Sequence, residues 1–244
     1  MDIISVIAAE LGVRVNQVDA AVKLIDEGNT IPFIARYRKE ATGALDDEQL
    51  RNLAERLTYL RNLEEKKEQV LSTIEEQGKL TEELKAQILA AQTLVVVEDL
   101  YRPYRPKRRT RATVAKEKGL EPLANILLLQ MTDRPMLAEA EAFVNEEKEV
   151  ASAADALAGA MDIVAESISD EADYRIRIRE LTVKKGVVRS EAKKPEEQSV
   201  FEMYYDFSEP VSKLAGHRVL ALNRGEAQKV LSVKVEVPGE DILR

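Results

Sequence analysis

The chain has 244 residues, a hydrophobic share of 45%, a charged share of 33% and a formal net charge of −8. This length allows one large domain or several small ones with a real core. There is no cysteine and only one histidine, which excludes disulfides, Cys-ligated metal sites and a His-based metal cluster. No stretch reaches the roughly 18 apolar residues of a membrane helix, and the start lacks a basic leader region. We therefore expect a soluble, cytoplasmic protein.

Residues 1–45 predict a cluster of short helices. Gly12 is expected to end the first helix and Asn16 to cap the second, while Pro32 suits the first turn of a third that runs to Arg38. The spacing of Ala8, Gly12 and Val18 matches a helix-turn-helix. The polar face of the second helix is net acidic, however, which favours a simple helical hairpin.

Residues 46–198 predict a helical scaffold built on one long helix over 46–77. Asp46 and Asp47 place acids at the favourable end of the helix dipole, and neither Gly nor Pro interrupts the segment before Gly78. A seam of leucines at heptad spacing resumes after a polar middle, residues 64–68. We expect a helix that packs at its two ends and is solvated in its centre. The leucines and isoleucine of the seam are Leu50, Leu53, Leu57, Leu60, Leu71 and Ile74.

We expect residues 199–244 to form a mixed segment that leads to further domains. Residues 199–207 hold most of the remaining aromatic side chains, and 230–237 alternate as a half-buried strand does. A single strand is not stable alone. We expect its sheet partners to lie beyond Arg244. The fold class is thus mainly α: multi-helical, with one long central helix and a small β element near the C-terminus.

The catalytic and nucleotide-binding motifs that can be sought in a sequence are missing. None of the glycines has the spacing of a phosphate-binding loop, and there is no nucleophile elbow. We expect no enzymatic activity, no metal site and no cofactor.

The most distinctive feature is the basic loop, residues 101–111, in which two prolines exclude a regular helix. It contains six cations and no acid, and two tyrosines lie between them. Guanidinium groups bind phosphate oxygens in pairs, and aromatic rings stack on unpaired bases. The cations and tyrosines are Tyr101, Arg102, Tyr104, Arg105, Lys107, Arg108, Arg109 and Arg111.

Two interpretations of the basic loop remain open. In the first, its arginines and the N-terminus of the helix that starts at Thr110 bind a phosphate backbone without regard to base sequence. Alternatively, the arginines pair with the acidic residues that fill 139–173 and lock the domain internally. A second basic and aromatic stretch, Arg36, Tyr37, Arg38 and Lys39, is a further candidate contact or the surface of a short helix.

Four strings resemble the N-terminal region of Tex-family bacterial transcription accessory proteins. They are GNTIPFIARYRKEATGALDDEQL (28–50), LRNLEEKKEQVLSTIEEQGKLT (60–81), EDLYRPYRPKRRTRATVAKEKGLEPLA (98–124) and HRVLALNRGE (217–226). The resemblance implies an all-helical N-terminal region with a long central helix. It also implies YqgF, helix-hairpin-helix and S1 RNA-binding domains farther along such a protein, none of which is recognisable in these residues.

The resemblance implies a role in transcription, with RNA or DNA as the partner of the full-length protein. We expect this part to contribute backbone contacts and scaffolding. The residues expected to make them are those of the basic loop with Arg36, Arg38 and Lys39. The alternative is a scaffold that binds no nucleic acid and positions the S1 and YqgF domains. Further expected partners are the transcription machinery and downstream domains of the same chain, and no membrane.

Overall fold

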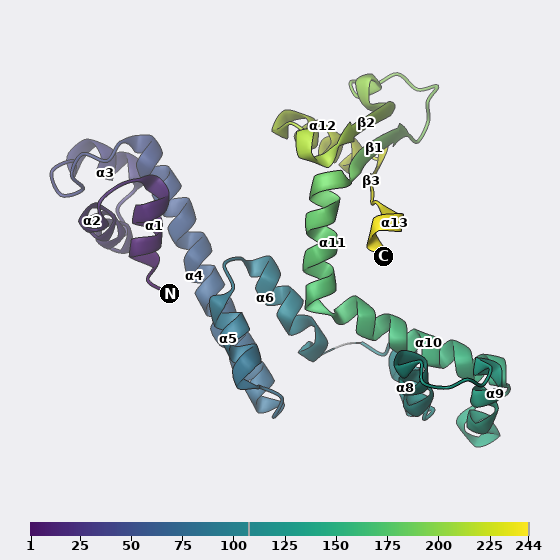
Figure 1. Ribbon diagram of the computed structural model, residues 1–244. Coiled ribbons are helices and arrows are strands. Elements are labelled where there is room, and N and C mark those ends of the chain that lie inside the picture. Colours follow the sequence, from purple (N-terminus) through teal and green to yellow (C-terminus); the bar gives the residue numbers. More distant parts are fainter. Residues whose placement is uncertain (107, 244) are drawn as a thin grey trace. The chain divides into compact units, whose positions relative to one another are not determined.

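The computed structural model describes residues 1–106 and 108–243. They form two compact units, residues 1–104 and 105–244. The first unit is helical, and the second combines helices with one small sheet (Figure 1). The prediction of a mainly α, multi-helical chain with one long helix and a small β element near its C-terminus is confirmed. Every helix of the described residues is too short or too polar to cross a membrane.

The long helix of the first unit, α4 (Asp47–Glu76), has 30 residues and a length of about 45 Å. Asp46 caps it, because its carboxylate accepts from the N–H of Gln49 (2.8 Å) while Gln49 accepts from the N–H of Asp46 (3.1 Å). This reciprocal capping satisfies two backbone donors at the helix start. The predicted start and length are confirmed.

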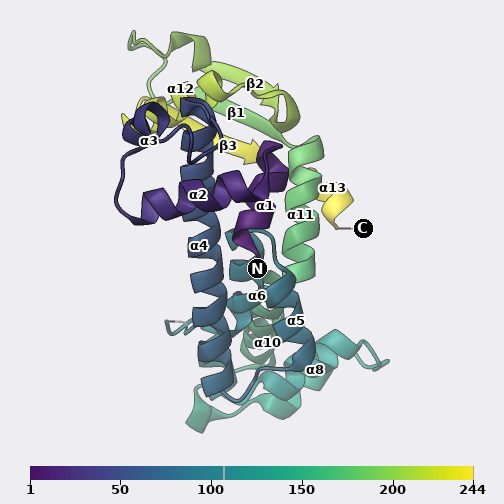
Figure 2. The ribbon, with the colours of Figure 1, turned by 90° about the vertical axis from the view of Figure 1, so that its left-hand side faces the viewer.

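Short helices pack along both halves of α4 (Figures 1 and 2). Gly12 ends α1 in the left-handed conformation (φ 64°), and Pro32 lies in the first turn of α3, both as predicted. The cap of the second helix was predicted wrongly: Arg14 precedes α2, and Asn16 lies inside it. Ala8 and Val18 are buried where α1 and α2 pack together. The helices are α1 (Ile3–Leu11), α2 (Val15–Asp26), α3 (Ile31–Tyr37), α5 (Glu82–Ala90), α6 (Leu94–Tyr101) and the 3-10 turn η1 (Arg102–Tyr104).

The centre of α4 is packed, which corrects the expectation of a solvated middle. Leu63 and Lys67 continue the buried stripe between Leu60 and Val70. Lys67 is only 2% exposed, and its ammonium donates to the carbonyl of Leu89 (2.9 Å). That carbonyl lies in the last turn of α5, where helical carbonyls lack a partner of their own. Lys67 therefore satisfies the end of α5 and complements its dipole.

The Lys67 ammonium also lies 2.9 Å from Glu64 Oε1, and the other oxygen of Glu64 accepts from the amine of Met1 (2.6 Å). Burial raises the pKa of Glu64, but the hydrogen bond from Met1 and the contact with Lys67 outweigh it and lower that pKa overall. A buried ammonium is costly unless it is paired and hydrogen-bonded. The carboxylate of Glu64 pairs with the Lys67 ammonium and the carbonyl of Leu89 accepts its hydrogen bond, so both requirements are met.

The helices that precede α10 (Ala153–Asp170) in the second unit pack around it, and Ser152 caps its N-terminus. Gly159 lies in close contact with Leu120, since a Cβ at this position would come within 2.5 Å of Leu120 Cδ1. The small side chains of α10 thus allow α7 and α8 to approach. The helical elements here are α7 (Arg111–Glu117), α8 (Glu121–Leu129), α9 (Met136–Ala140), the 3-10 turns η2 (Glu141–Phe143) and η3 (Glu146–Lys148), and α11 (Ala172–Lys185).

The sheet of the second unit has the order β2-β1-β3 and is antiparallel throughout. The predicted strand, β3 (Leu231–Glu236), pairs with β1 (Val187–Ala192), so its partner does not lie beyond Arg244 as expected. Leu222 and Gly225 of α12 (Gly216–Ala227) are buried near Leu231, whose side chain fills the space a Cβ of Gly225 would need. The remaining elements are β2 (Asp206–Pro210), η4 (Glu202–Tyr204), η5 (Val211–Lys213) and α13 (Gly239–Ile242).

We predict that Lys67→Met destabilises the first unit by about 1–3 kcal/mol, because it leaves the carbonyl of Leu89 without its donor. Hydrogen exchange of α4 and α5 amides in the 244-residue chain measures this effect. The control is Lys85→Met, an exposed position on α5, for which a change below about 0.5 kcal/mol is expected. Equal protection in both variants would show that the buried ammonium adds nothing to stability.

Two further ion pairs tie the short helices to α4 and predict acid sensitivity. Glu10 accepts from Arg56 (2.6 and 2.7 Å), and Asp26 accepts from Arg61 (2.7 and 2.8 Å). These hydrogen bonds lower the pKa of Glu10 and the pKa of Asp26. A carboxyl with a lowered folded-state pKa stabilises the fold above its unfolded pKa and ceases to do so as pH falls through the folded pKa.

We therefore predict that the melting temperature of the first unit falls as pH drops below about 4, and that Arg56→Gln with Arg61→Gln flattens this fall. Circular-dichroism melting over a pH series measures it. Arg51→Gln is the matched control, because Arg51 pairs with Asp47 inside α4 and joins no second helix. An undiminished acid transition in the double variant would contradict the assignment.

Candidate nucleic-acid interface

The basic loop begins at the end of α6 and ends where α7 starts. It crosses the boundary between the two units, which lies between Tyr104 and Arg105. Its predicted contact residue Lys107 lies outside the described residues. The first half of the loop, 101–104, belongs to the first unit, and the second half, 105–111, belongs to the second unit.

The tyrosines of the first half pack against the core of the first unit. Tyr101 and Tyr104 are half-buried beside the hydrophobic cluster of α4 and its neighbours. The ammonium of Lys66 lies 5.6 Å from the centre of the Tyr101 ring, and Gln77 donates to the carbonyl of Tyr104 (2.8 Å). Part of the ring area that was expected to stack on bases is therefore used in packing. Arg102 lies exposed between them.

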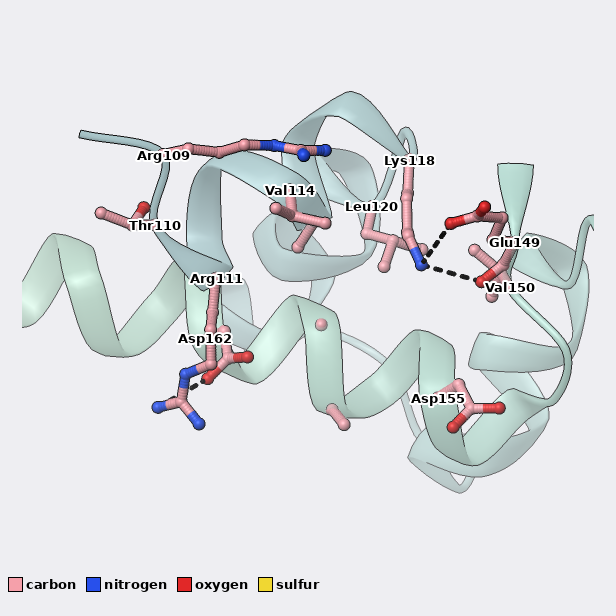
Figure 3. Close-up of a pocket in the computed structure, with 13 residues that line it drawn as sticks. Arg109, Thr110, Arg111, Val114, Lys118, Leu120, Glu149, Val150, Asp155 and Asp162 are labelled. Atoms are coloured by element: carbon pink, nitrogen blue, oxygen red, sulfur yellow. Dashed lines mark hydrogen bonds and ion pairs between the residues drawn. The ribbon is translucent and has the colours of Figure 1, made fainter. Parts of the chain in front are cut away.

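Arg109 and Arg111, in the second half of the loop, border a hollow of about 500 Å³ between α7 and α10 (Figure 3). Arg109 Nη2 lies 2.9 Å from Glu117 Oε2, and Arg111 Nη2 lies 3.3 Å from Asp162 Oδ1. Lys118 across the hollow donates to the carbonyl of Glu149 (2.9 Å). The described cations at the rim thus have acidic or carbonyl partners within the same unit.

These contacts bear on the two interpretations of the loop. Asp162 belongs to the acidic run that was expected to neutralise the arginines, whereas Glu117 lies on α7 itself. The side chain of Arg111 is 88% exposed and that of Arg109 is 70% exposed. Exposed ion pairs contribute about 0–1 kcal/mol to stability, so these two pairs hold the loop only weakly to the rest of the second unit. Arg105 and Arg108 are also exposed.

The second basic stretch lies at the end of α3, and we define the α3 patch as Phe33, Arg36, Tyr37, Arg38 and Lys39. All five side chains are exposed. The rings of Phe33 and Tyr37 are 5.3 Å apart between centroids and tilted by 47°. The guanidinium of Arg38 lies 5.6 Å from the centre of the Phe33 ring. Sequence reasoning missed Phe33, although its spacing of four from Tyr37 places both rings on one helix face.

The turn that follows α3 is held by internal hydrogen bonds. The buried hydroxyl of Thr42 donates to the carbonyl of Arg38 (3.2 Å), and Ala44 N–H donates to the carbonyl of Lys39 (2.7 Å). Gln17 of α2 donates to the carbonyl of Gly43 (2.8 Å). Gly43 has φ 60° and touches Gln17 so closely that a Cβ would lie 2.9 Å from Gln17 Nε2. The backbone that carries the patch is thus ordered before any ligand binds.

The charges of the α3 patch differ from those of the basic loop in their partners. Among residues 1–106 and 108–243, Arg36, Arg38 and Lys39 form no ion pair. They border a hollow of about 370 Å³ over residues 36–41, where Glu40 is the one acid. Cations without an ion pair can bind phosphate oxygens, and the exposed rings beside them can stack on bases.

Two family models match separate parts of the chain. The Tex-like protein N-terminal domain matches residues 1–75, and the Tex central region-like model matches residues 131–243. The chain belongs to the Tex family. The first match contains the whole α3 patch, whereas the basic loop lies between the two matched regions.

Curated Tex relatives extend well beyond this chain. It is 48% identical to Protein tex of Bordetella pertussis over 235 residues, covering 96% of the chain and 30% of that protein. It is 44% identical to Transcriptional accessory protein Tex of Neisseria gonorrhoeae, covering 99% and 32%. It is 33% identical to S1 RNA-binding domain-containing protein 1 of Homo sapiens, covering 88% and 22%. The chain spans about a third of the length of the bacterial relatives.

For the second unit of this Tex-family chain, we predict that Arg109→Ala and Arg111→Ala each change the free energy of unfolding by less than about 0.5 kcal/mol, since both ion pairs are exposed. Urea unfolding measures it. Leu123→Ala, at a fully buried position of α8, should cost about 2–5 kcal/mol and serves as the positive control. A loss above about 1 kcal/mol in either arginine variant would favour the internal clamp.

Proposed function

We propose that this chain is the scaffold part of a transcription accessory protein and makes auxiliary contacts with the sugar–phosphate backbone of RNA or DNA. The names of two relatives support this: one is called a transcriptional accessory protein, and the other an S1 RNA-binding domain-containing protein. The proposed role is binding and positioning, with no catalytic step.

The observation that carries the proposal is the set of three exposed cations, Arg36, Arg38 and Lys39, without ion pairs among the described residues. A phosphate that binds there has to displace no carboxylate. At Arg109 and Arg111 it competes with Glu117 and Asp162. The α3 patch is therefore the primary contact in this proposal, and the basic loop is the secondary one.

The acidic net charge sets the expected strength of binding. A chain with a net charge of −8 repels a polyanion at long range. The Debye length is about 8 Å at physiological salt, so a local group of cations still attracts phosphate at contact distance. We expect weak binding that is lost as salt rises, because each contact releases condensed counterions.

A second candidate is a scaffold that binds no nucleic acid. The ion pairs of Arg109 with Glu117 and of Arg111 with Asp162 favour it, because they use loop cations inside the second unit. The 30-residue helix α4 is also long enough to act as a spacer between other parts of such a scaffold. The two candidates differ in one measurable quantity, the salt-dependent affinity of the chain for nucleic acid.

We predict that Arg36→Ala, Arg38→Ala and Lys39→Ala together lower the affinity for a single-stranded oligonucleotide. They should also reduce the slope of log affinity against log salt by about 1.4 to 2, since two or three phosphate contacts are lost and each removes about 0.7. Fluorescence anisotropy of a labelled strand across a salt series measures both. The matched control removes three other exposed cations of the first unit, Lys23, Lys79 and Lys85, and should leave the slope nearly unchanged.

A second variant tests the secondary contact. Arg105→Ala, Arg108→Ala, Arg109→Ala and Arg111→Ala together should reduce the slope by less than the α3 triple variant, because Arg109 and Arg111 have acidic partners. If the wild type, the triple variant and the quadruple variant all show the same slope of log affinity against log salt, these residues do not contact nucleic acid. The second candidate, a scaffold that binds no nucleic acid, would then be favoured.

A further inference from the structure

We propose that the α3 patch binds single-stranded nucleic acid, with an unpaired base stacked on the ring of Tyr37 and the adjacent phosphates held by Arg36 and Lys39. This inference rests on the proposed function and adds the ligand class of the same site. It follows from the exposure of the rings, the position of Arg38 and the rigid turn behind the patch.

Tyr37 has the ring with the accessible surface. The residue is 62% exposed, against 37% for Phe33. Tyr101 and Tyr104 of the basic loop are half-buried against the core. An aromatic ring that is mostly exposed adds less to the stability of the fold than a buried one, whereas it offers a flat face to a base.

The neighbours of Tyr37 support the ring and do not cover it. The 47° tilt between Tyr37 and Phe33 keeps the two rings from stacking face to face. Arg38 lies over the ring of Phe33, and no cation lies over the ring of Tyr37 among the described residues. Phe33 with Arg38 therefore forms the support, and Tyr37 forms the platform.

The order of the turn lowers the cost of binding. Thr42 bonds the carbonyl of Arg38, and Gln17 bonds the carbonyl of Gly43, so the backbone between Tyr37 and Gly43 is held from both sides. A contact that is already ordered loses less conformational entropy when the ligand arrives. Glu40 is the opposing charge at this hollow, and three cations outnumber it.

The chemistry favours a single strand over a duplex. In a duplex the faces of the bases are covered by their neighbours, so an exposed ring gains nothing from them. In a single strand the bases are unstacked or easily unstacked and can lie on an aromatic side chain. Cations alone hold both forms, so the ring is the feature that discriminates between them.

The test compares Tyr37→Ala with Tyr37→Phe in the 244-residue chain. The probes are oligo(dT), oligo(U) and a blunt-ended DNA duplex without a loop, all at one low salt concentration. We expect Tyr37→Ala to weaken single-strand binding about fivefold to tenfold and duplex binding less than twofold, while Tyr37→Phe retains single-strand affinity. Tyr174→Ala, an exposed tyrosine of the second unit, is the control and should change neither.

The outcomes separate this inference from the proposed function. If Tyr37→Ala has no effect while the triple cation variant loses binding, the stacking inference is wrong and the proposed function stands. If Tyr37→Ala weakens the binding of duplex and single strand equally, the inference that the Tyr37 ring favours a single strand is wrong. If the wild-type chain binds none of the three probes, both proposals fail. Unchanged melting temperatures of the Tyr37 variants exclude misfolding as the cause of any loss.

Discussion

The first unit depends on one continuous buried stripe along α4, and the stripe is continuous only because Lys67 can be buried. Its aliphatic stem lies in line with Leu60, Leu63 and Val70, and its ammonium satisfies the last turn of α5. A long polar side chain can thus cover apolar surface while its charged end finds a partner. Without a partner at the helix end, the same residue would expose the middle of α4, and the neighbouring helices would pack on two separate patches.

The length, start and flanking seams of α4 follow from the sequence, because capping and apolar spacing are local signals. The packed centre of α4 cannot be predicted in this way. Lys67 is a polar residue by type, and the carbonyl that allows it to be buried belongs to Leu89, 22 residues away. The sheet shows the same limit. The alternation of residues 230–237 predicts a strand, but its partner β1 lies some 40 residues earlier, where Ala192 pairs with Leu231. Pairing over such separations leaves no local trace in the chain.

The candidate site shows what counting charges omits. The basic loop has the densest run of cations in the chain, yet Arg109 and Arg111 have carboxylate partners, and its tyrosines contribute to a core. The shorter stretch at 36–39 has fewer cations but no such partners among the described residues. Its order comes from Gln17, Thr42 and Gly43, whose contacts depend on how α2 meets the turn. Only the three-dimensional structure reveals which cations remain available to a ligand.

An acidic chain with a small basic and aromatic patch implies a particular kind of contact. Three cations and one ring give few phosphate contacts, and the overall charge of −8 opposes approach at low salt. Such a patch binds weakly by itself. It gains strength when another nucleic-acid contact in the same polypeptide raises its effective concentration near the strand. The relatives are about three times as long as this chain, which leaves room for such a contact. In the proposed arrangement the α3 patch would add affinity only where the strand is unpaired, because only there would Tyr37 have a free base to stack on.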